Sequence, residues 1–407
     1  MFMKTIMKKI ALASALSLLV AGAHAACSFE NTTPIKLLSA GFEAWKAVSS
    51  AMAECGNFEA ELDQEFRTKQ TAAFAANPAL YQLGGVSNGT ITPLYNEGTI
   101  RPLDDLVEKY GQQLKPNQLI KIDGRVMAIA MMVNTQHLQY REDILSGLDI
   151  EVPQTWDEVL AAAEKINAAG VVEYPLGATM KAGWNLAQDF NNMFLGFGGT
   201  FVNPDNTPAV NSEAGINALN MMQRITEYLH PEYLTADSTF VQQQFQKDQI
   251  AMANFWASRA GASDDANESQ VVGKVATASA PLAMADGKPA TTLWWDGIVI
   301  AKNISDEEAE AAFRVAMEGL DTEMVQANND TAVWLIEGYV PGRLAEGAIA
   351  TAMGGPAAYP STTQMGLMHT ALGNKLPDFF TGSKSAEETL QAVEEDYITA
   401  AKEAGLL

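Results

Sequence analysis

The chain is poor in cysteine, histidine and basic residues. Among 407 residues there are two cysteines and four histidines, and 26 Lys and Arg residues stand against 49 Asp and Glu residues. So few and such scattered ligands disfavour a zinc or copper site, and we expect neither a metal nor a cofactor. The formal net charge of −23 makes nucleic acid and anionic membrane surfaces poor partners.

The motifs of several enzyme classes are also missing. The glycine-rich loop at 84–89 lacks the spacing of a dinucleotide site and has no P-loop lysine. There is no Gly-x-Ser-x-Gly elbow and no His-Glu-x-x-His, and the acidic pair Asp104-Asp105 opens a predicted helix, where carboxylates favour the helix dipole. We therefore predict no catalytic residues and a protein that is not an enzyme, although a secreted glycoside-acting enzyme remains an alternative.

The first 25 residues have the pattern of a secretory signal peptide. Three lysines precede an apolar run over 10–23, and Ala23-His24-Ala25 supplies small residues for cleavage before Ala26. No later stretch has the roughly 20 apolar residues that span a bilayer, so we expect a soluble periplasmic protein. In an oxidising compartment the isolated pair Cys27 and Cys55 favours a disulfide, with free thiols or a metal site as the alternatives.

Strand and helix patterns alternate from residue 35 onward, which favours an α/β fold. A chain of this length exceeds what one core usually organises, so we expect two lobes. Thr155 and Glu158 have the spacing of a capping box at a helix start. The first elements are predicted as strands at 35–39, 58–62 and 80–83, with helices at 43–55 and 64–76.

The stretch 240–258 combines a helix, a polar turn and a short apolar strand that runs into Phe255-Trp256. A strand that ends in tryptophan places a flat ring at the rim of a sheet, where open α/β sheets bind ligands. Packing of Trp256 in the core is the competing interpretation.

Several short motifs follow one another along the chain. They are the Asp123-Gly124-Arg125 hairpin followed by Asn134, YREDIL at 140–145, PQTWDE at 153–158, FGGTF at 197–201, KDQIAM at 247–252 with Trp256, APL at 280–282 and GIVIAK at 297–302. Their order and spacing resemble the family 1 extracellular solute-binding proteins of ABC importers, the clan of the maltose-binding protein. The resemblance covers nearly the whole mature chain.

The resemblance implies an α/β, two-lobe periplasmic-binding-protein fold with a multi-strand hinge and a ligand cleft between the lobes. It places the chain crossings after Val133, near 292–297 and near 320–325. The first lobe would comprise 26–133 plus 296–320, and the second 134–295 plus 321–407. The sequence departs from the family where Trp294-Trp295-Asp296 replaces small residues, which indicates a smaller ligand than a long oligosaccharide.

Sugars present apolar faces and many hydroxyl groups, so their sites need aromatic rings and planar polar side chains. For Trp294 hinge packing is the competing interpretation, and for Arg343 a surface salt bridge. The candidate ligand-binding residues are Trp256, Trp184, Trp295, Asp296, Asn134, Arg343, Glu43, Ser87 and Asn88.

The function that the resemblance implies is capture of a carbohydrate, as a sugar, small oligosaccharide or sugar derivative, by lobe closure. The expected partners are this small molecule and the permease subunits of an ABC transporter, and we expect a monomer. An amino acid, a polyamine or an organic anion as the ligand of the same fold is the alternative.

Overall fold

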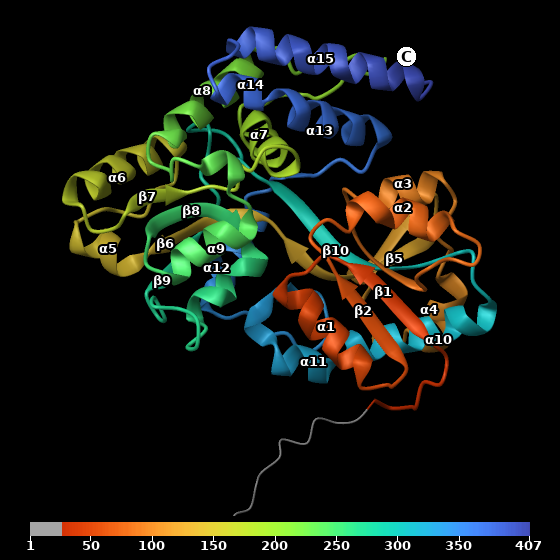
Figure 1. The fold of residues 1–407 in the computed structure, drawn as a ribbon. Coiled ribbons are helices and arrows are strands. Elements are labelled where there is room, and N and C mark those ends of the chain that lie inside the picture. Colours follow the sequence, from red (N-terminus) through yellow and green to blue (C-terminus); the bar gives the residue numbers. More distant parts are fainter. Residues whose placement is uncertain (1–26) are drawn as a thin grey trace, which may run out of the picture.

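The computed structural model describes residues 27–407. The predicted signal peptide at 1–25 and the predicted new N-terminus at Ala26 lie outside these residues. The described chain folds into two α/β lobes, each built on its own sheet (Figure 1). The predicted fold class is therefore confirmed.

The first lobe is organised by an eight-stranded sheet whose main path runs β2-β1-β3-β10-β5-β11. Strand β1 pairs in parallel with β2 and β3, whereas β10 runs antiparallel to both β3 and β5. The strands are β1 (Ile35–Ser39), β2 (Phe58–Leu62), β3 (Leu83–Ser87), β4 (Leu119–Ile122), β5 (Arg125–Asn134), β10 (Thr292–Ile300), β11 (Val333–Trp334) and β12 (Ala357–Ala358).

Helices cover both faces of this sheet (Figure 1). On one face α1, α10 and α11 enclose a core around Trp45 and Phe313, and on the other α2 and α3 pack Phe74 and Leu94 against the strands. The helices of this lobe are α1 (Glu43–Ala53), α2 (Arg67–Ala75), α3 (Ile91–Asn96), α4 (Asp104–Tyr110), α10 (Asp306–Gly319) and α11 (Thr322–Ala327).

The third strand lies later in the chain than predicted. The predicted strand at 80–83 and loop at 84–89 are wrong, since β3 covers Leu83–Ser87 and is buried along its whole length. Glycine suits this central strand because a Cβ at Gly85 would lie 2.0 Å from the Ser39 Oγ, and one at Gly84 would lie 2.6 Å from the Phe74 ring. Close packing between layers, rather than a loop, explains these glycines.

The second lobe has a smaller sheet, in the order β7-β8-β6-β9, with one parallel pair between β7 and β8. The predicted capping box is present, since the Thr155 side chain accepts a hydrogen bond from the backbone of Glu158. The strands are β6 (Gln136–Arg141), β7 (Tyr174–Gly177), β8 (Ile250–Trp256) and β9 (Val275–Ala278). The helices are α5 (Glu142–Gly147), α6 (Trp156–Ala169), α7 (Trp184–Gly196), α8 (Glu213–Thr226), α9 (Ser238–Gln246), α12 (Glu346–Met353), α13 (Thr363–Lys375), α14 (Pro377–Phe380) and α15 (Ala386–Glu403).

The lobes are joined where β5 leads into β6 and where β10 enters the first sheet (Figure 1). Buried hydroxyl groups tie these two connections together. The Thr135 hydroxyl lies 3.1 Å from that of Thr291 and donates to the Thr292 carbonyl at 3.0 Å. The predicted multi-strand hinge thus contains β5 and β10, which pair with each other.

The third crossing between the lobes lies later in the chain than the predicted boundary at residue 320. Met324 and Val325 of α11 pack into the core of the first lobe, and β11 pairs with β5 of the first sheet. Leu344 is the next residue that packs into the core of the second lobe. The chain therefore crosses between Ile336 and Leu344, because α11 and β11 carry apolar side chains that the first lobe buries.

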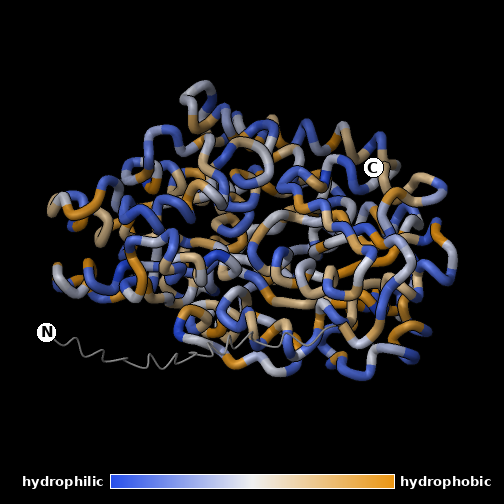
Figure 2. Tube along the Cα trace, turned by 60° about the horizontal axis from the view of Figure 1, so that its bottom comes forward, coloured by the Kyte–Doolittle hydropathy of each residue, from blue (hydrophilic) through white to orange (hydrophobic). Residues whose placement is uncertain are grey.

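Along residues 27–407 the hydrophobic segments are short and interrupted by hydrophilic ones (Figure 2). None of the helices in this range is both long enough and apolar enough to cross a membrane.

The predicted disulfide is present and joins Cys27 to Cys55, which are 28 residues apart. It ties the start of the described chain to the turn that follows α1. In the chain-entropy account such a loop closure stabilises the folded protein by roughly 3–4 kcal/mol.

Reduction of this disulfide is expected to lower the free energy of unfolding by roughly 3–4 kcal/mol, because the unfolded chain regains the freedom of the loop. Urea unfolding of the oxidised protein and of a Cys27→Ser, Cys55→Ser double variant would measure the difference. Equal unfolding midpoints for the two proteins would contradict the expectation.

Candidate functional site

A cavity of about 160 Å³ lies between the two lobes. Its wall is formed where strands end and helices begin. From the first lobe, Ala40 and Phe42 follow β1, 64–67 follow β2, and Ser87 ends β3. Ligands of open α/β sheets bind at such carboxyl ends of strands, so this position is the one that the fold favours for a ligand.

The second lobe and the hinge supply the remaining wall. Residues at the start of α7 and α9 face the cavity, together with the end of β8 and the first half of β10. These residues are Lys181, Trp184, Asn185, Asp237, Ser238, Thr239, Trp256, Ser258, Arg259, Trp294 and Asp296.

Three tryptophans line the cavity, together with Phe42 and Phe66. The ring of Trp294 lies 5.8 Å from that of Trp184 and 5.9 Å from that of Trp256, both edge to face. Trp294 also packs on Tyr359, with ring centres 4.1 Å apart. Trp256 and Trp294 also belong to the core of the second lobe and are 8% and 5% exposed, so Trp256 both packs in the core and borders the cavity. The parts of the three rings that face the cavity offer the apolar contact that the C–H face of a sugar or polyol requires.

Trp184 is already engaged by neighbours. The guanidinium of Arg67 lies 4.6 Å above its ring, and His369 stacks against it at 5.0 Å. Burial lowers the pKa of His369 to about 4, so its imidazole is neutral at pH 7 and accepts or donates hydrogen bonds without a charge. Since Arg67 comes from the first lobe and Trp184 from the second, their cation–π contact joins the lobes across the cavity.

The charged groups of the cavity are only partly paired. Lys181 lies 3.7 Å from Asp237 and 4.0 Å from Glu65, so its charge is matched. Burial raises the pKa of Asp296 to about 7, and the nearby Arg67 opposes this shift. Asp296 is therefore close to half protonated at neutral pH and presents a carboxyl group that can donate or accept a hydrogen bond.

Four of the predicted ligand-binding residues line this cavity: Trp184, Trp256, Asp296 and Ser87. Trp294, for which hinge packing was the competing interpretation, lines it as well. Along β10 side chains alternate between faces, so Trp294 and Asp296 share the cavity side and Trp295 points the other way. Trp295 packs beside the core formed by α2 and α3.

The other predicted residues lie outside this cavity. Asn134 is buried and donates to the Ser258 hydroxyl at 3.1 Å, which holds a cavity residue in place. Asn88 is buried and donates to the carbonyls of Leu293 and Tyr359, at 3.1 Å each. Both amides thus tie structural elements together next to the cavity.

Glu43 and Arg343 are placed elsewhere. Glu43 pairs with Lys46 at 2.6 Å and lines a neighbouring cavity of about 510 Å³, which shares Thr239, Ser258 and Arg259 with the first. Arg343 forms a salt bridge with Asp264 and donates to the Val275 carbonyl. The competing interpretation of Arg343, a surface salt bridge, is what the structure contains.

Three basic residues that were not among the predicted site residues line the cavity, namely Arg67, Lys181 and Arg259. Their positions carried a signal, since Arg67 follows β2 and Arg259 follows β8. Ligands of open α/β sheets bind at the carboxyl ends of strands, so the loops after β2 and β8 predict ligand contacts as well as Trp256 does.

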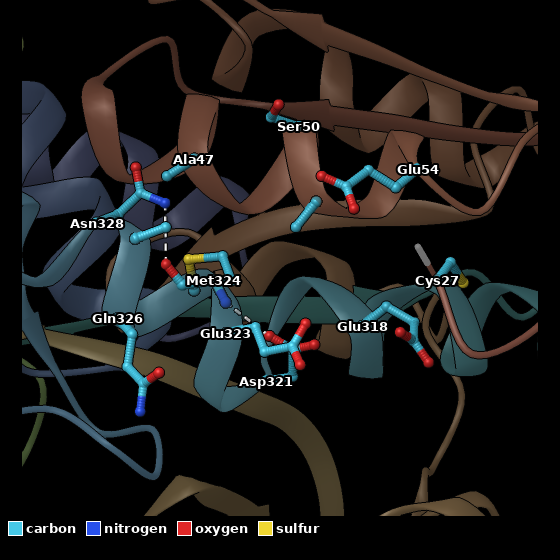
Figure 3. A pocket seen from close by; sticks show the side chains of 12 residues that line it. Cys27, Ala47, Ser50, Glu54, Glu318, Asp321, Glu323, Met324, Gln326 and Asn328 are labelled. Carbon is cyan, nitrogen blue, oxygen red and sulfur yellow. Dashed lines mark hydrogen bonds between the residues drawn. The ribbon is translucent and has the colours of Figure 1, made fainter. Parts of the chain in front are cut away.

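Another cavity, with a volume of about 560 Å³, lies on the outer side of the first lobe, away from the cleft (Figure 3). Glu54 of α1 faces Asp321 and Glu323 across it, and Cys27 and Glu318 lie at one end (Figure 3). It is larger than the cleft cavity but has acidic side chains without aromatic rings. The Cys27, Cys55 and Glu318 ligand atoms lie close together there, but both sulfurs belong to the disulfide and offer no thiolate to a metal.

Solved structures with the same fold include solute-binding proteins of ABC transporters. One from Agrobacterium radiobacter K84, in complex with ribitol, superposes with a TM-score of 0.80 at 20% identity, covering 91% of this chain and 99% of that one. One from Agrobacterium vitis S4, with bound D-mannitol, has a TM-score of 0.77 at 18% identity, with coverage of 91% and 99%. Maltose-bound MalE3 of T. maritima has a TM-score of 0.77 at 18% identity, with coverage of 90% and 99%.

Two relatives share part of the sequence. The sn-glycerol-3-phosphate-binding periplasmic protein UgpB of Rhizobium meliloti (strain 1021) is 26% identical over 182 residues, which are 42% of this chain and 38% of that protein. UgpB of Brucella abortus (strain 2308) is 31% identical over 116 residues, 26% of this chain and 25% of that protein. The matches thus span well under half of either relative.

The family model of the bacterial extracellular solute-binding proteins matches residues 57–318, which is more than half of the chain. This match agrees with the two lobes, the strands that join them and the cavity between them. The chain belongs to the bacterial extracellular solute-binding protein family.

Proposed function

We propose that the protein captures a carbohydrate or polyol in the cavity between its lobes and delivers it to the permease of an ABC transporter. It acts in the periplasm as a monomer and binds its ligand without chemical change. The observation that carries the proposal is the cavity itself, in which three tryptophan rings stand beside hydroxyl, amide and carboxyl groups from both lobes.

The chemistry of the wall supports this class of ligand. Trp256 and Trp294 offer rings for the C–H face of a sugar, while Ser87, Asn185 and Asp296 offer donors and acceptors for hydroxyl groups. A volume of about 160 Å³ is below the roughly 300–1,000 Å³ of sites for drug-sized ligands, which favours one small sugar or polyol. Ribitol and D-mannitol, which are bound to two structurally similar proteins, belong to this size class.

Capture proceeds by closure of the lobes. A ligand that touches Ser87 in the first lobe and Trp256 in the second gains both sets of contacts only when the lobes are together. It therefore shifts the population toward the closed form by its difference in affinity for the two forms. The closed form is the one that the permease would recognise.

The test is a thermal-shift screen of the mature protein against monosaccharides, disaccharides, polyols, acidic sugars, amino acids and polyamines. A ligand at 100 times its dissociation constant adds about 2.7 kcal/mol of stability, which raises the melting temperature measurably. Small-angle scattering with the best ligand should then show a smaller radius of gyration. A shift with amino acids or polyamines alone would retain the fold and replace the ligand class, and turnover of a glycoside would revive the enzyme alternative.

A further inference from the structure

Arg259 is an unusual residue in the cavity wall. It follows β8, the residue is only 8% exposed, and it lines both the cleft cavity and the neighbouring larger one. Charged side chains in such positions are normally paired with an opposite charge, because removing a charge from water is costly.

The partners of Arg259 do not supply that charge. Its guanidinium donates to the Gln242 side-chain oxygen at 2.8 Å, which is a neutral acceptor. Glu43 and Asp237 are the acids whose charges act on it, but within residues 27–407 no carboxylate lies within 4.0 Å of it. Asp237 is nearer to Lys181, at 3.7 Å. Arg259 thus retains donors and a charge that this cavity does not satisfy.

Arg67 brings a second guanidinium from the other lobe. The charges of Asp296 and Glu65 act on it, but among residues 27–407 no carboxylate lies within the 4.0 Å of a salt bridge. Its aromatic contacts are the rings of Trp184 at 4.6 Å and Phe66 at 4.8 Å. The planar fork of a guanidinium matches the oxygens of a carboxylate or phosphate.

The charge balance of the cavity differs from that of the protein as a whole. Three basic residues, Arg67, Lys181 and Arg259, face three acids, Glu65, Asp237 and Asp296. Asp296, whose pKa is raised to about 7, carries only part of a negative charge at neutral pH. The lining is therefore neutral to slightly positive within a chain whose formal charge is −23.

We propose that the natural ligand is an anionic polyhydroxy compound, such as a sugar acid or a polyol phosphate, whose negative group is held by Arg259 and Arg67 from opposite lobes. This inference rests on the proposed function and names the ligand class of the same site. The anion neutralises the buried charge of Arg259, and its hydroxyl-bearing part lies toward Trp256 and Asp296. Because the two arginines belong to different lobes, one anionic group couples binding to closure.

The experiment compares matched pairs of probes by isothermal titration calorimetry with the mature protein. The pairs are D-gluconate with D-glucitol, which tests a carboxylate, and glycerol 3-phosphate with glycerol, which tests a phosphate. We expect one anionic member to bind at least about tenfold more tightly than its neutral partner, as charge-assisted bidentate hydrogen bonds provide. The pair that shows the preference identifies the kind of anion.

Arg259→Gln keeps a planar polar group and removes the charge. It is expected to abolish the preference for the anion while the ligand-free protein melts at an equal or higher temperature, since an unpaired buried charge is gone. Arg224→Gln is the matched control. Arg224 lies on α8 of the same lobe, is about half exposed and pairs with Asp157, so its replacement should leave the preference unchanged.

Each result decides between the proposals. Neutral polyols that bind as tightly as their anionic partners, or an Arg259→Gln variant that keeps the preference, would overturn this inference and leave the proposed function standing. If no neutral or anionic probe binds and only amino acids or polyamines shift the melting temperature, both proposals are wrong.

Discussion

Replacing Trp256 with alanine is expected to weaken ligand binding by roughly 100-fold or more, which corresponds to about 2.7 kcal/mol. Trp256 ends β8, lines the cleft cavity and contacts Trp294 edge to face at 5.9 Å. Unlike the Trp184 ring, which Arg67 and His369 already contact, it has no stacked partner among the aromatic contacts of residues 27–407. Titration calorimetry with the solute that gives the largest thermal shift would measure the loss.

Trp295→Phe is the matched control for this prediction. Trp295 follows the cavity residue Trp294 on β10, but its side chain packs on the opposite side from Trp294 and beside the core of the first lobe. Its replacement should leave the affinity within about threefold. Circular dichroism of Trp256→Ala and Trp256→Phe would establish that both variants are folded. An unchanged affinity in Trp256→Ala would show that the ligand does not contact this ring.

Gly297→Ala is expected to destabilise the protein by about 3 kcal/mol. Gly297 lies in β10 between β3 and β5, next to an irregularity in the register at Asp296. A Cβ there would lie 2.3 Å from the Ile129 carbonyl oxygen and 2.8 Å from the Ala130 Cα. Both atoms are backbone, so a hinge strand has to shift. The midpoint of urea unfolding at constant pH would measure the effect.

Gly366→Ala provides the comparison. Gly366 lies within α13, and nothing lies within 4 Å of the position that a Cβ would take. Alanine has a higher helix propensity than glycine. The free energy of unfolding of this variant should therefore be unchanged or higher by up to about 1 kcal/mol. If Gly297→Ala were as stable as Gly366→Ala, the close approach of β10 to β5 would not be the reason for glycine in the hinge strand.

Local patterns were sufficient for most of the elements. The helix predicted before the polar turn at 247–249 appears as α9, and the apolar strand that ends in Trp256 appears as β8. The Thr155 capping box opens α6. These features depend on residues a few positions apart, which the sequence displays directly. The strand at Leu83–Ser87 was misplaced because its glycines are explained by Ser39 and Phe74, which lie in other elements.

The candidate site was predicted only in part, since position in the sequence does not give orientation. Alternation along β10 requires that Trp294 and Trp295 point to opposite faces, but it does not say which face borders the cavity. Asn134 was placed next to the site, yet its amide is occupied by Ser258. Arg343 is matched by Asp264, a pairing of residues 79 positions apart that no local pattern indicates.

The sequence by itself determined the α/β class, the order of the elements, the pairing of its two cysteines and the resemblance to solute-binding proteins. The class and the elements follow from periodicity, capping residues and turn residues, the cysteine pairing from there being only two cysteines, and the resemblance from the order of the motifs. Only the tertiary structure decided which side chains meet between the lobes. Whether a charge such as that of Arg259 is paired, and whether a ring such as that of Trp184 is free, depends on contacts between segments far apart in the chain.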